Sequence, residues 1–163
     1  MTRVMPTASH ANVMRDTEAL LAHLASRPDV QSDRIGITGY CMGGRLALYA
    51  AGHFGERIAA AGVVHGGRLA TDAPDSPHRL APRMKARIYV AGAIDDTSFD
   101  DPQKARLEQA FSDAGVDHTI ETYNALHGWV LSDTPVHDAA ATAKHWETLM
   151  ALFRETLKAS EPI

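Results

Sequence analysis

Short apolar runs alternate with helical segments along this chain, and this alternation restricts the possible folds more than any other feature. Four runs have the length and the flanking turn residues of buried strands: 34–39, 59–65, 87–93 and 118–123. Four further segments carry apolar residues at steps of three and four, as helices do: 12–25, 42–53, 101–114 and 138–157. Strands that alternate with such helices form a parallel sheet covered on both faces. We therefore expect an α/β fold, a parallel sheet flanked by helices, in a single domain over 1–163, since this length suffices for one domain and not for two.

The helices and loops carry more detailed expectations. In the first helix one face is expected to be buried: Val13, Met14, Thr17, Leu20, Leu21 and Leu24. In the last helix the expected buried residues are Ala139, Ala143, Trp146, Met150, Phe153 and Leu157. Asp101 before Pro102 predicts the N-cap of the third helix, and Gly115 its end. The proline- and glycine-rich segment 66–82 predicts a long surface loop.

The residues from Gly39 to Gly44, Gly-Tyr-Cys-Met-Gly-Gly, stand where a predicted strand ends and a predicted helix begins. Small residues relieve the crowding of a sharp strand-to-helix turn, and such a turn exposes its central residue as a nucleophile. That residue is Cys41, where serine is usual. The helix N-terminus would favour its thiolate, and the Met42 N–H would point at a developing oxyanion. The alternative interpretation is a small buried cysteine beside packing glycines, and its position on the turn favours the nucleophile.

Residues with complementary chemistry follow the other predicted strands. His127 lies in the loop between the last strand and the last helix, where a base would face the nucleophile, although a solvated loop histidine is the alternative. Asp95 and Asp96 both follow the third strand, and either could orient the histidine or simply bond its own turn. His65 follows the second strand and could line the pocket, or be a partly buried histidine without a role. Carboxyl ends of parallel strands meet at one edge, so we expect these side chains together.

Composition argues against several other functions. The net charge of −4 and the lack of a basic patch with interleaved aromatics disfavour nucleic acid as a partner. The apolar runs are too short to cross a membrane, and the first ten residues have no apolar signal core, so we expect a soluble cytoplasmic domain. The histidines and the single cysteine show no metal-binding spacing, and no glycine-rich phosphate motif follows a strand. We expect neither a metal nor a cofactor.

These residues resemble the motifs of the dienelactone hydrolases, a family of the α/β-hydrolase superfamily. Segment 35–45 is similar to the family's nucleophile segment, segment 92–99 to its acid loop, and segment 127–129 to its histidine with the following small residue and aromatic. The resemblance covers nearly the whole chain. It implies hydrolysis of a carboxylic ester or lactone through an acyl-cysteine on Cys41, with His127 as base. The position of the acid in the family's loop favours Asp96 over Asp95.

The chain departs from the family pattern in two ways. It lacks the family's N-terminal strands, with their second oxyanion donor and a glutamate that bonds the resting thiol, so the expected fold is a truncated α/β-hydrolase. Leu131 stands where the resemblance predicts a carboxylate-binding arginine. The alternatives are therefore an inactive or weakly active homologue serving as a binding domain, or an acyltransferase with a cysteine at the turn. The strand at 35–39 would keep one unpaired edge, so we expect the chain to pair there as a homo-oligomer, to aggregate, or to need an N-terminal segment supplied from elsewhere.

Overall fold

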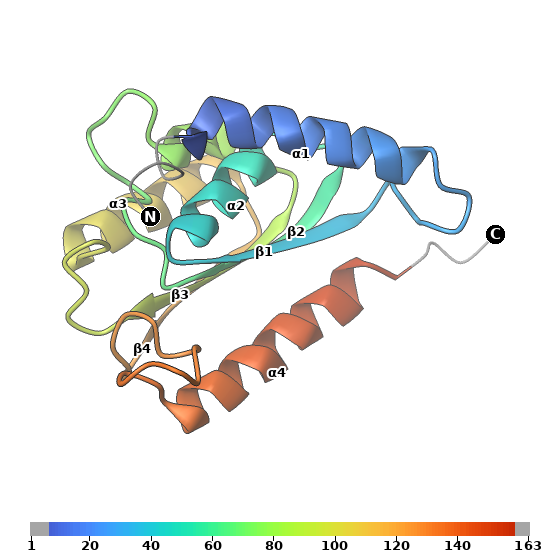
Figure 1. The fold of residues 1–163 in the computed structure, drawn as a ribbon. Helices are drawn as coiled ribbons and strands as arrows, with labels where there is room; N and C mark the ends of the chain where they lie inside the picture. Colours follow the sequence, from blue (N-terminus) through green and yellow to red (C-terminus); the bar gives the residue numbers. More distant parts are fainter. Residues whose placement is uncertain (1–6, 159–163) are drawn as a thin grey trace.

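The computed structural model describes residues 7–158 and contains one four-stranded sheet (Figure 1). The elements follow in the order α1 (His10–Ala25), β1 (Ile35–Tyr40), α2 (Met42–His53), β2 (Ile58–Val64), the 3-10 helix η2 (Pro77–Arg83), β3 (Arg87–Ala93), α3 (Asp101–Ala114), β4 (His118–Tyr123) and α4 (Ala139–Thr156). All strands are parallel, in the spatial order β1-β2-β3-β4. The predicted α/β class, with a parallel sheet flanked by helices, is confirmed.

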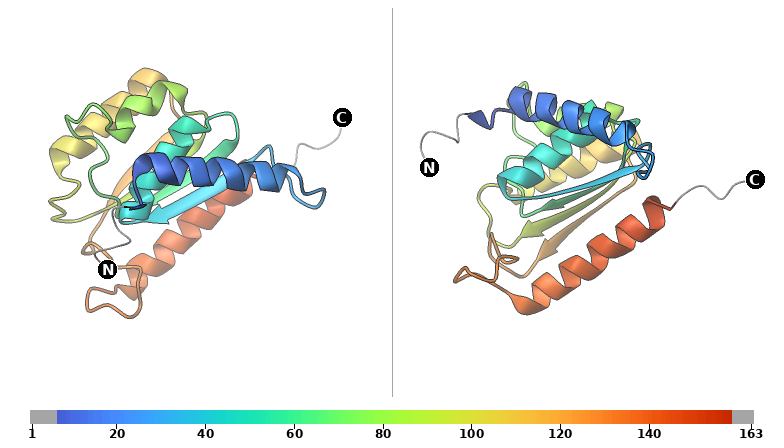
Figure 2. Two further views of the ribbon diagram at one scale, coloured as in Figure 1. Left: turned by 45° about the horizontal axis from the view of Figure 1, so that its top comes forward. Right: turned by 45° about the vertical axis from the view of Figure 1, so that its right-hand side comes forward.

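The helices cover the sheet unequally. Helices α1, α2 and α3 lie on one face, while α4 alone crosses the other (Figures 1 and 2). On the first face Leu48 of α2 and Phe111 of α3 pack with the sheet in one apolar core. On the second face Leu149 of α4 packs with Tyr89 and Trp129 in another. Each face therefore has its own core, and the carboxyl ends of the strands emerge between them.

The face of α4 that contacts the sheet is only partly the predicted one, since Phe153 and Leu157 pack against the core as expected. The buried residues of α4 are His145, Leu149 and Leu152, whereas Trp146 is 46% exposed and Met150 40% exposed. The reason lies in the sheet, because Gly62 of β2 leaves room for Leu149. A Cβ at that glycine would lie 2.5 Å from the Leu149 Cδ1 atom. The predictions for Ala139, Ala143, Trp146 and Met150 were therefore wrong, because the helix turns His145, Leu149 and Leu152 toward the sheet instead.

Helix α1 also buries fewer residues than predicted. Met14 and Leu21 are buried, but Leu20 is 56% exposed, which contradicts the prediction for that residue. Met14 packs against Tyr49 and Ala50 of α2. Since α1 rests on α2 rather than directly on the sheet, only a narrow stripe of its surface is covered.

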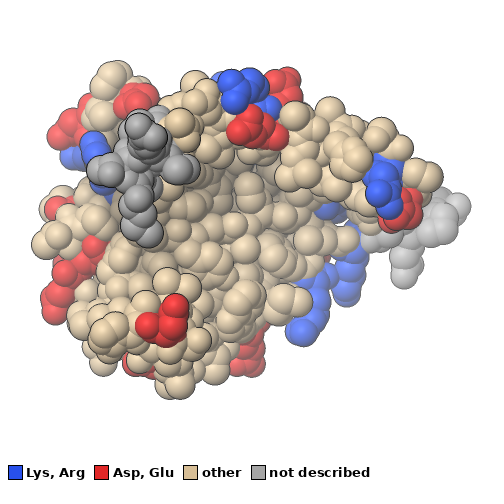
Figure 3. Space-filling model, in the orientation of Figure 1, with Lys and Arg blue, Asp and Glu red and all other residues tan. Residues whose placement is uncertain are grey.

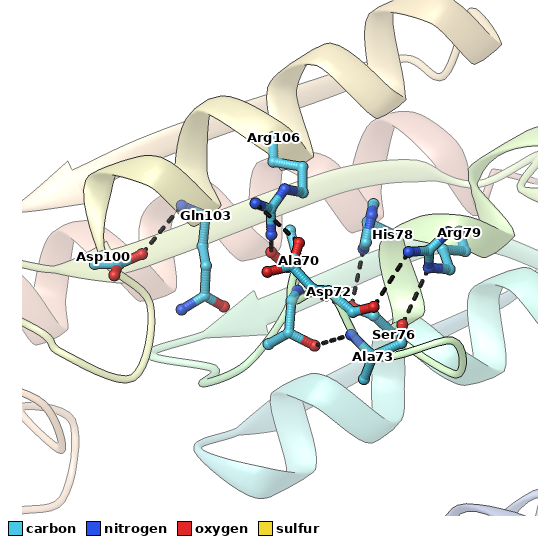
Figure 4. Close-up of polar contacts among 10 residues, drawn as sticks. Ala70, Asp72, Ala73, Ser76, His78, Arg79, Asp100, Gln103 and Arg106 are labelled. Carbon is cyan, nitrogen blue, oxygen red and sulfur yellow. Dashed lines mark hydrogen bonds and ion pairs between the residues drawn. The ribbon is translucent and has the colours of Figure 1, made fainter.

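The segment between β2 and β3 is not the surface loop that its prolines predicted. It contains η2, and Leu69, Ala70 and Ser76 are buried. Figure 4 shows that α3 helps to hold it: Arg106 donates to the carbonyl of Ala70 at 2.7 Å. Within the segment the Ser76 hydroxyl accepts the Thr71 N–H at 2.9 Å. These bonds satisfy backbone groups that would otherwise be buried without partners.

The start of α3 differs from the prediction by one residue. Asp100, not Asp101, is the N-cap, and its side chain accepts the N–H of Gln103 at 3.1 Å (Figure 4). Asp101 and Pro102 then occupy the first turn of the helix. Gly115 ends α3 with a φ of 67°, as predicted, because glycine adopts this left-handed backbone without steric cost.

Strand β1 lies at the edge of the sheet and pairs only with β2 among the described residues. The face of the molecule on which β1 lies is largely uncharged at its centre, with acidic and basic residues around the margin (Figure 3). The exposed Trp146 contacts Tyr40 of β1, with ring centroids 6.4 Å apart. Across residues 7–158, no helix has the length and apolar character needed to cross a membrane.

Candidate active site

Backbone strain is concentrated where three strands end. Cys41 follows β1 with a φ of 54°, His65 follows β2 with a φ of 35°, and Asp95 lies just beyond β3 with a φ of 52°. Residues other than glycine rarely adopt positive φ, and such strain tends to collect at functional sites. The ends of adjacent parallel strands are neighbours, so these three residues mark one edge of the sheet.

The turn at Cys41 depends on the glycine before it. A Cβ at Gly39 would lie 2.0 Å from the carbonyl oxygen of Gly43, so no other residue lets the first turn of α2 approach β1 so closely. Cys41 is the N-cap of α2 and is exposed, and Met42 is the first residue of the helix. The Met42 N–H therefore belongs to the helix N-terminus, where unsatisfied donors favour negative charge.

His127 and Asp96 meet across two loops. The Nδ1 atom of His127 lies 2.8 Å from Oδ2 of Asp96, whose side chain is only 5% exposed. The other carboxylate oxygen accepts two hydrogen bonds from Ser98, one from its N–H at 2.9 Å and one from its hydroxyl at 2.6 Å. Burial acts to raise the pKa of Asp96, but the hydrogen bonds from Ser98 and His127 outweigh it, so the pKa lies below its ordinary value. The carboxylate is thus ionised and held in place.

The structure places Asp95 differently from Asp96. Asp95 is exposed and occupies the left-handed turn itself. Next to it, the N–H of Ile94 donates to the carbonyl of Ala125 at 3.1 Å, which joins the loop after β3 to the loop after β4. This bond holds the two loops together just where Asp96 reaches His127.

The loop that carries His127 is anchored by Trp129. The Trp129 ring is fully buried and stacks on Tyr123 of β4, with ring centroids 5.1 Å apart. Its carbonyl accepts the N–H of Asp138 at 3.0 Å, so the loop is tied to the start of α4. Gly128, between His127 and Trp129, has a φ of 96°, which glycine adopts freely. The order histidine, glycine, tryptophan therefore has a structural reason.

His65 contacts both the turn at Cys41 and the loop that carries His127. Its side chain is 1% exposed, and its Nδ1 accepts the backbone N–H of Cys41 at 3.1 Å. Its ring centroid lies 5.0 Å from that of His127 and 5.0 Å from that of Trp129. Burial lowers the pKa of His65 to about 4, and the neighbouring His127 lowers it as well. The sequence suggested only a pocket position for His65, because its contact with Cys41 depends on the register of β1 and β2.

A cavity of about 270 Å³ lies beside α2, and neither Cys41 nor His127 lines it. Arg45 and Tyr49 line it, and they follow Cys41 at successive steps of four, which places the three on one stripe of the helix. Arg68, three residues after His65, lines its other side. Sequence reasoning missed both arginines, although the spacing from Cys41 could have revealed Arg45.

The remaining sequence predictions concern ligands. Leu131 is 51% exposed. Within residues 7–158 no group of three or more histidine, cysteine, aspartate or glutamate side chains could hold a metal ion. The Cys41 thiol makes no hydrogen bond with any of the described residues. What the arrangement offers is an exposed thiol at a helix N-terminus and a carboxylate-oriented imidazole at the same sheet edge.

Comparisons with known proteins identify the family of the chain. The family model described as "Dienelactone hydrolase family" matches residues 1–157. A Synechocystis protein named "Putative carboxymethylenebutenolidase" is 27% identical over 92% of this chain, and one of the same name from Methylorubrum extorquens is 28% identical over 95%. This chain covers 62% and 54% of those relatives, so it spans less than two thirds of their length.

Solved structures share the fold. A dienelactone hydrolase-like promiscuous phosphotriesterase from metagenomic libraries superposes with a TM-score of 0.76 and 26% identity. That match covers 95% of this chain and 66% of the other. A "Putative Dienelactone Hydrolase" from Klebsiella pneumoniae superposes with a TM-score of 0.82 at 22% identity, over 93% of this chain and 64% of the other.

Proposed function

The chain belongs to the dienelactone hydrolase family, and from that premise we propose that it hydrolyses carboxylic esters or lactones through an acyl-cysteine formed on Cys41. The observation that carries the proposal is the hydrogen bond of 2.8 Å between His127 and Asp96 at the sheet edge where Cys41 stands exposed. A nucleophile, a base and a carboxylate that orients the base are the parts that acyl transfer requires.

The proposed reaction has two halves. In the first, the Cys41 thiolate attacks the carbonyl carbon, the Met42 N–H stabilises the oxyanion, and protonated His127 gives its proton to the departing alkoxide. In the second, His127 takes a proton from water as the water attacks the thioester, and the collapse of the intermediate expels the thiolate and releases the carboxylic acid. Asp96 holds the proton of His127 on Nδ1 and stabilises the imidazolium, so that Nε2 is free to exchange protons with substrate.

Membership of a hydrolase family supports a small-molecule substrate. The cavity of about 270 Å³ beside Arg45 and Tyr49 has the size for part of a small ester, although Cys41 itself does not line it. The reaction requires a reduced thiol, and Cys41 is both free and exposed. We therefore place the activity in a reducing compartment, with the cytoplasm as the proposed location.

The test is a titration of Cys41 with an ester-mimicking thiol reagent and a burst assay with p-nitrophenyl acetate. Cys41 is the single cysteine of the chain, so any thiol modification reports on it alone. The parent should show a burst of nitrophenol and an acyl adduct by mass spectrometry, and His127→Ala should lose the burst while it keeps the thiol. A parent that binds the ester without a burst would support a binding domain instead. An acyl adduct released faster to added alcohols than to water would support an acyltransferase.

The open edge of β1 supports a further part of the proposal, that a second copy of the chain pairs there. Ile35 and Cys41 direct their N–H groups to β2, at 2.9 Å from Arg57 O and 3.0 Å from Val64 O. Because direction alternates along a strand, the N–H of Thr38 points to the open side. Unpaired donors and acceptors on an uncharged face recruit other strands (Figure 3).

A further inference from the structure

We propose that His65 is a positioning residue for the nucleophile, which fixes the Cys41 turn by accepting its backbone N–H and spaces that turn from the His127 loop. The inference rests on the proposed function, in which Cys41 attacks and His127 transfers protons. It assigns to His65 a role that reaches the substrate only through these two residues.

The first support is the doubly held amide of Cys41. Its N–H donates to the carbonyl of Val64 at 3.0 Å and to Nδ1 of His65 at 3.1 Å. Val64 stands opposite Tyr40 in the ladder, so this pair of bonds closes the sheet directly before the turn. The turn that follows carries a φ of 54° and a ψ of −120°, a backbone that cysteine adopts only where its surroundings enforce it. The second acceptor is part of that enforcement.

The second support is the protonation state that this bond requires. A ring nitrogen that accepts a hydrogen bond carries no proton, so neutral His65 has its proton on Nε2. Burial keeps the pKa of His65 at about 4, so the ring stays a neutral acceptor well below neutral pH. The titratable groups facing it are His127, His145 and Asp96. A cationic His65 would lose its acceptor and would oppose the imidazolium that His127 forms during turnover.

The third support is the place of the ring between the two halves of the site. The His65 ring meets the Trp129 ring edge-on, at 5.0 Å and an interplanar angle of 74°, and it lies 5.0 Å from the ring of His127. Trp129 anchors the His127 loop. Because the His65 ring packs against that loop and also bonds Cys41, it fixes the distance between the loop and the Cys41 turn. The backbone of His65 itself has a φ of 35°, which costs energy and is consistent with a functional constraint.

The test uses two substitutions of nearly the same shape. His65→Asn places an oxygen at the same number of bonds from the backbone as Nδ1, so it keeps an acceptor, and asparagine tolerates positive φ. His65→Leu has a similar outline and no acceptor. A third variant, His65→Phe, keeps a ring without an acceptor. Circular dichroism and thermal melting establish that each variant folds, and the Asn–Phe comparison replaces the Asn–Leu comparison if His65→Leu does not.

Two measurements are made on each variant. The first is the rate of acylation by p-nitrophenyl acetate in stopped flow. We expect His65→Leu to lose roughly tenfold, the factor that corresponds to about one hydrogen bond, with KM unchanged. We expect His65→Asn to recover most of that loss. The second is the pH profile of alkylation of Cys41 by iodoacetamide, which needs no esterase activity. Its midpoint should move in His65→Leu and stay near the parent value in His65→Asn.

The two measurements separate the failure of this inference from the failure of the proposed function. A parent without an acylation burst refutes the hydrolase, whereas the alkylation profiles still test whether His65 positions the thiol. Equal profiles and equal rates in His65→Asn and His65→Leu, whether both resemble the parent or both are impaired, would show that the acceptor plays no part and would overturn the inference.

Discussion

Replacement of Asp96 by asparagine exchanges one carboxylate oxygen for an NH2 group and should disable the proposed base, His127. The Oδ1 atom of Asp96 accepts both hydrogen bonds from Ser98, and Oδ2 faces Nδ1 of His127 at 2.8 Å. In Asp96→Asn the Ser98 donors will keep the amide oxygen on their side, so the amide NH2 must face His127. An NH2 donor at that place makes Nδ1 of His127 the acceptor and forces the ring proton onto Nε2. Nε2 is the atom that must be unprotonated to act as the base.

The size of the effect follows from the exposure of the two side chains. In the serine-protease example of this exchange, in which the carboxylate is buried, the turnover falls by about 10⁴. Here Asp96 is 5% exposed but His127 is 34% exposed, so water can bond the misplaced tautomer and allow it to rotate. Cysteine also depends less on its base than serine does. We expect a loss of about 10² to 10³, or about 3 to 4 kcal/mol in the barrier.

The assay is the pre-steady-state burst of p-nitrophenyl acetate, which measures formation of the acyl-cysteine rather than its hydrolysis. The control is Asp95→Asn, which removes the neighbouring charge from an exposed turn and should leave the burst rate within about twofold, as surface changes do. A burst rate in Asp96→Asn within a few fold of the parent would refute the reasoning from the Ser98 bonds. A larger loss in Asp95→Asn would transfer the role to Asp95.

Three further predictions follow from the same structure. Cys41→Ala should abolish the acyl adduct seen by mass spectrometry, and Cys41→Ser should keep a slow turnover; an adduct in the alanine variant would contradict the assignment. His65 and His145 are buried with pKa values of about 4 against 6.5 when unfolded, so the unfolded chain binds more protons between these values. Urea unfolding should therefore show a free energy of unfolding that falls from pH 7 to pH 5 by about 2 kcal/mol for each ring, and a flat profile would contradict this. Thr38→Pro removes an N–H from the open edge of β1 and should shift the mass from light scattering toward the monomer; a mass that is monomeric in the parent would exclude the pairing.

Much of the fold could be predicted because local signals and tertiary structure agree. The strand at 87–93, the strand at 118–123 and the helix at 42–53 have the predicted bounds. Each is a clear periodic or apolar run next to glycine, proline or aspartate, which end regular structure for backbone reasons. The contact face of α4 was predicted only in part, because Gly62 in β2 leaves room for Leu149 against the sheet. The space left by a glycine in β2 cannot be recognised from the sequence of α4.

Part of the candidate site could likewise be predicted from the sequence, and part of it could not. Cys41, His127 and the pair Asp95 and Asp96 could be proposed from the sequence because each follows a strand, and the ends of parallel strands share an edge. The choice of Asp96 within the pair came from the resemblance to the family. The hydrogen bond between Cys41 and His65 could not, because it requires the register of β1 against β2 and a left-handed backbone at a residue that is not glycine. Arg68 was missed because the segment between β2 and β3 is not the exposed loop that its composition predicted.

The open edge of β1 also bears on the rate of catalysis, because Cys41 stands at the end of that strand. In the proposed mechanism the Met42 N–H at the start of α2 stabilises the oxyanion, and the loss of one such donor typically slows acyl transfer by about 10² to 10³. A strand that pairs with β1 would place its own backbone groups next to the nucleophile turn. If a second copy supplies that strand, the rate per chain should rise with protein concentration over the range in which light scattering shows association. A rate per chain that stays constant while the mass doubles would show that association and the rate are independent. Pairing at β1 would then play no part in the reaction.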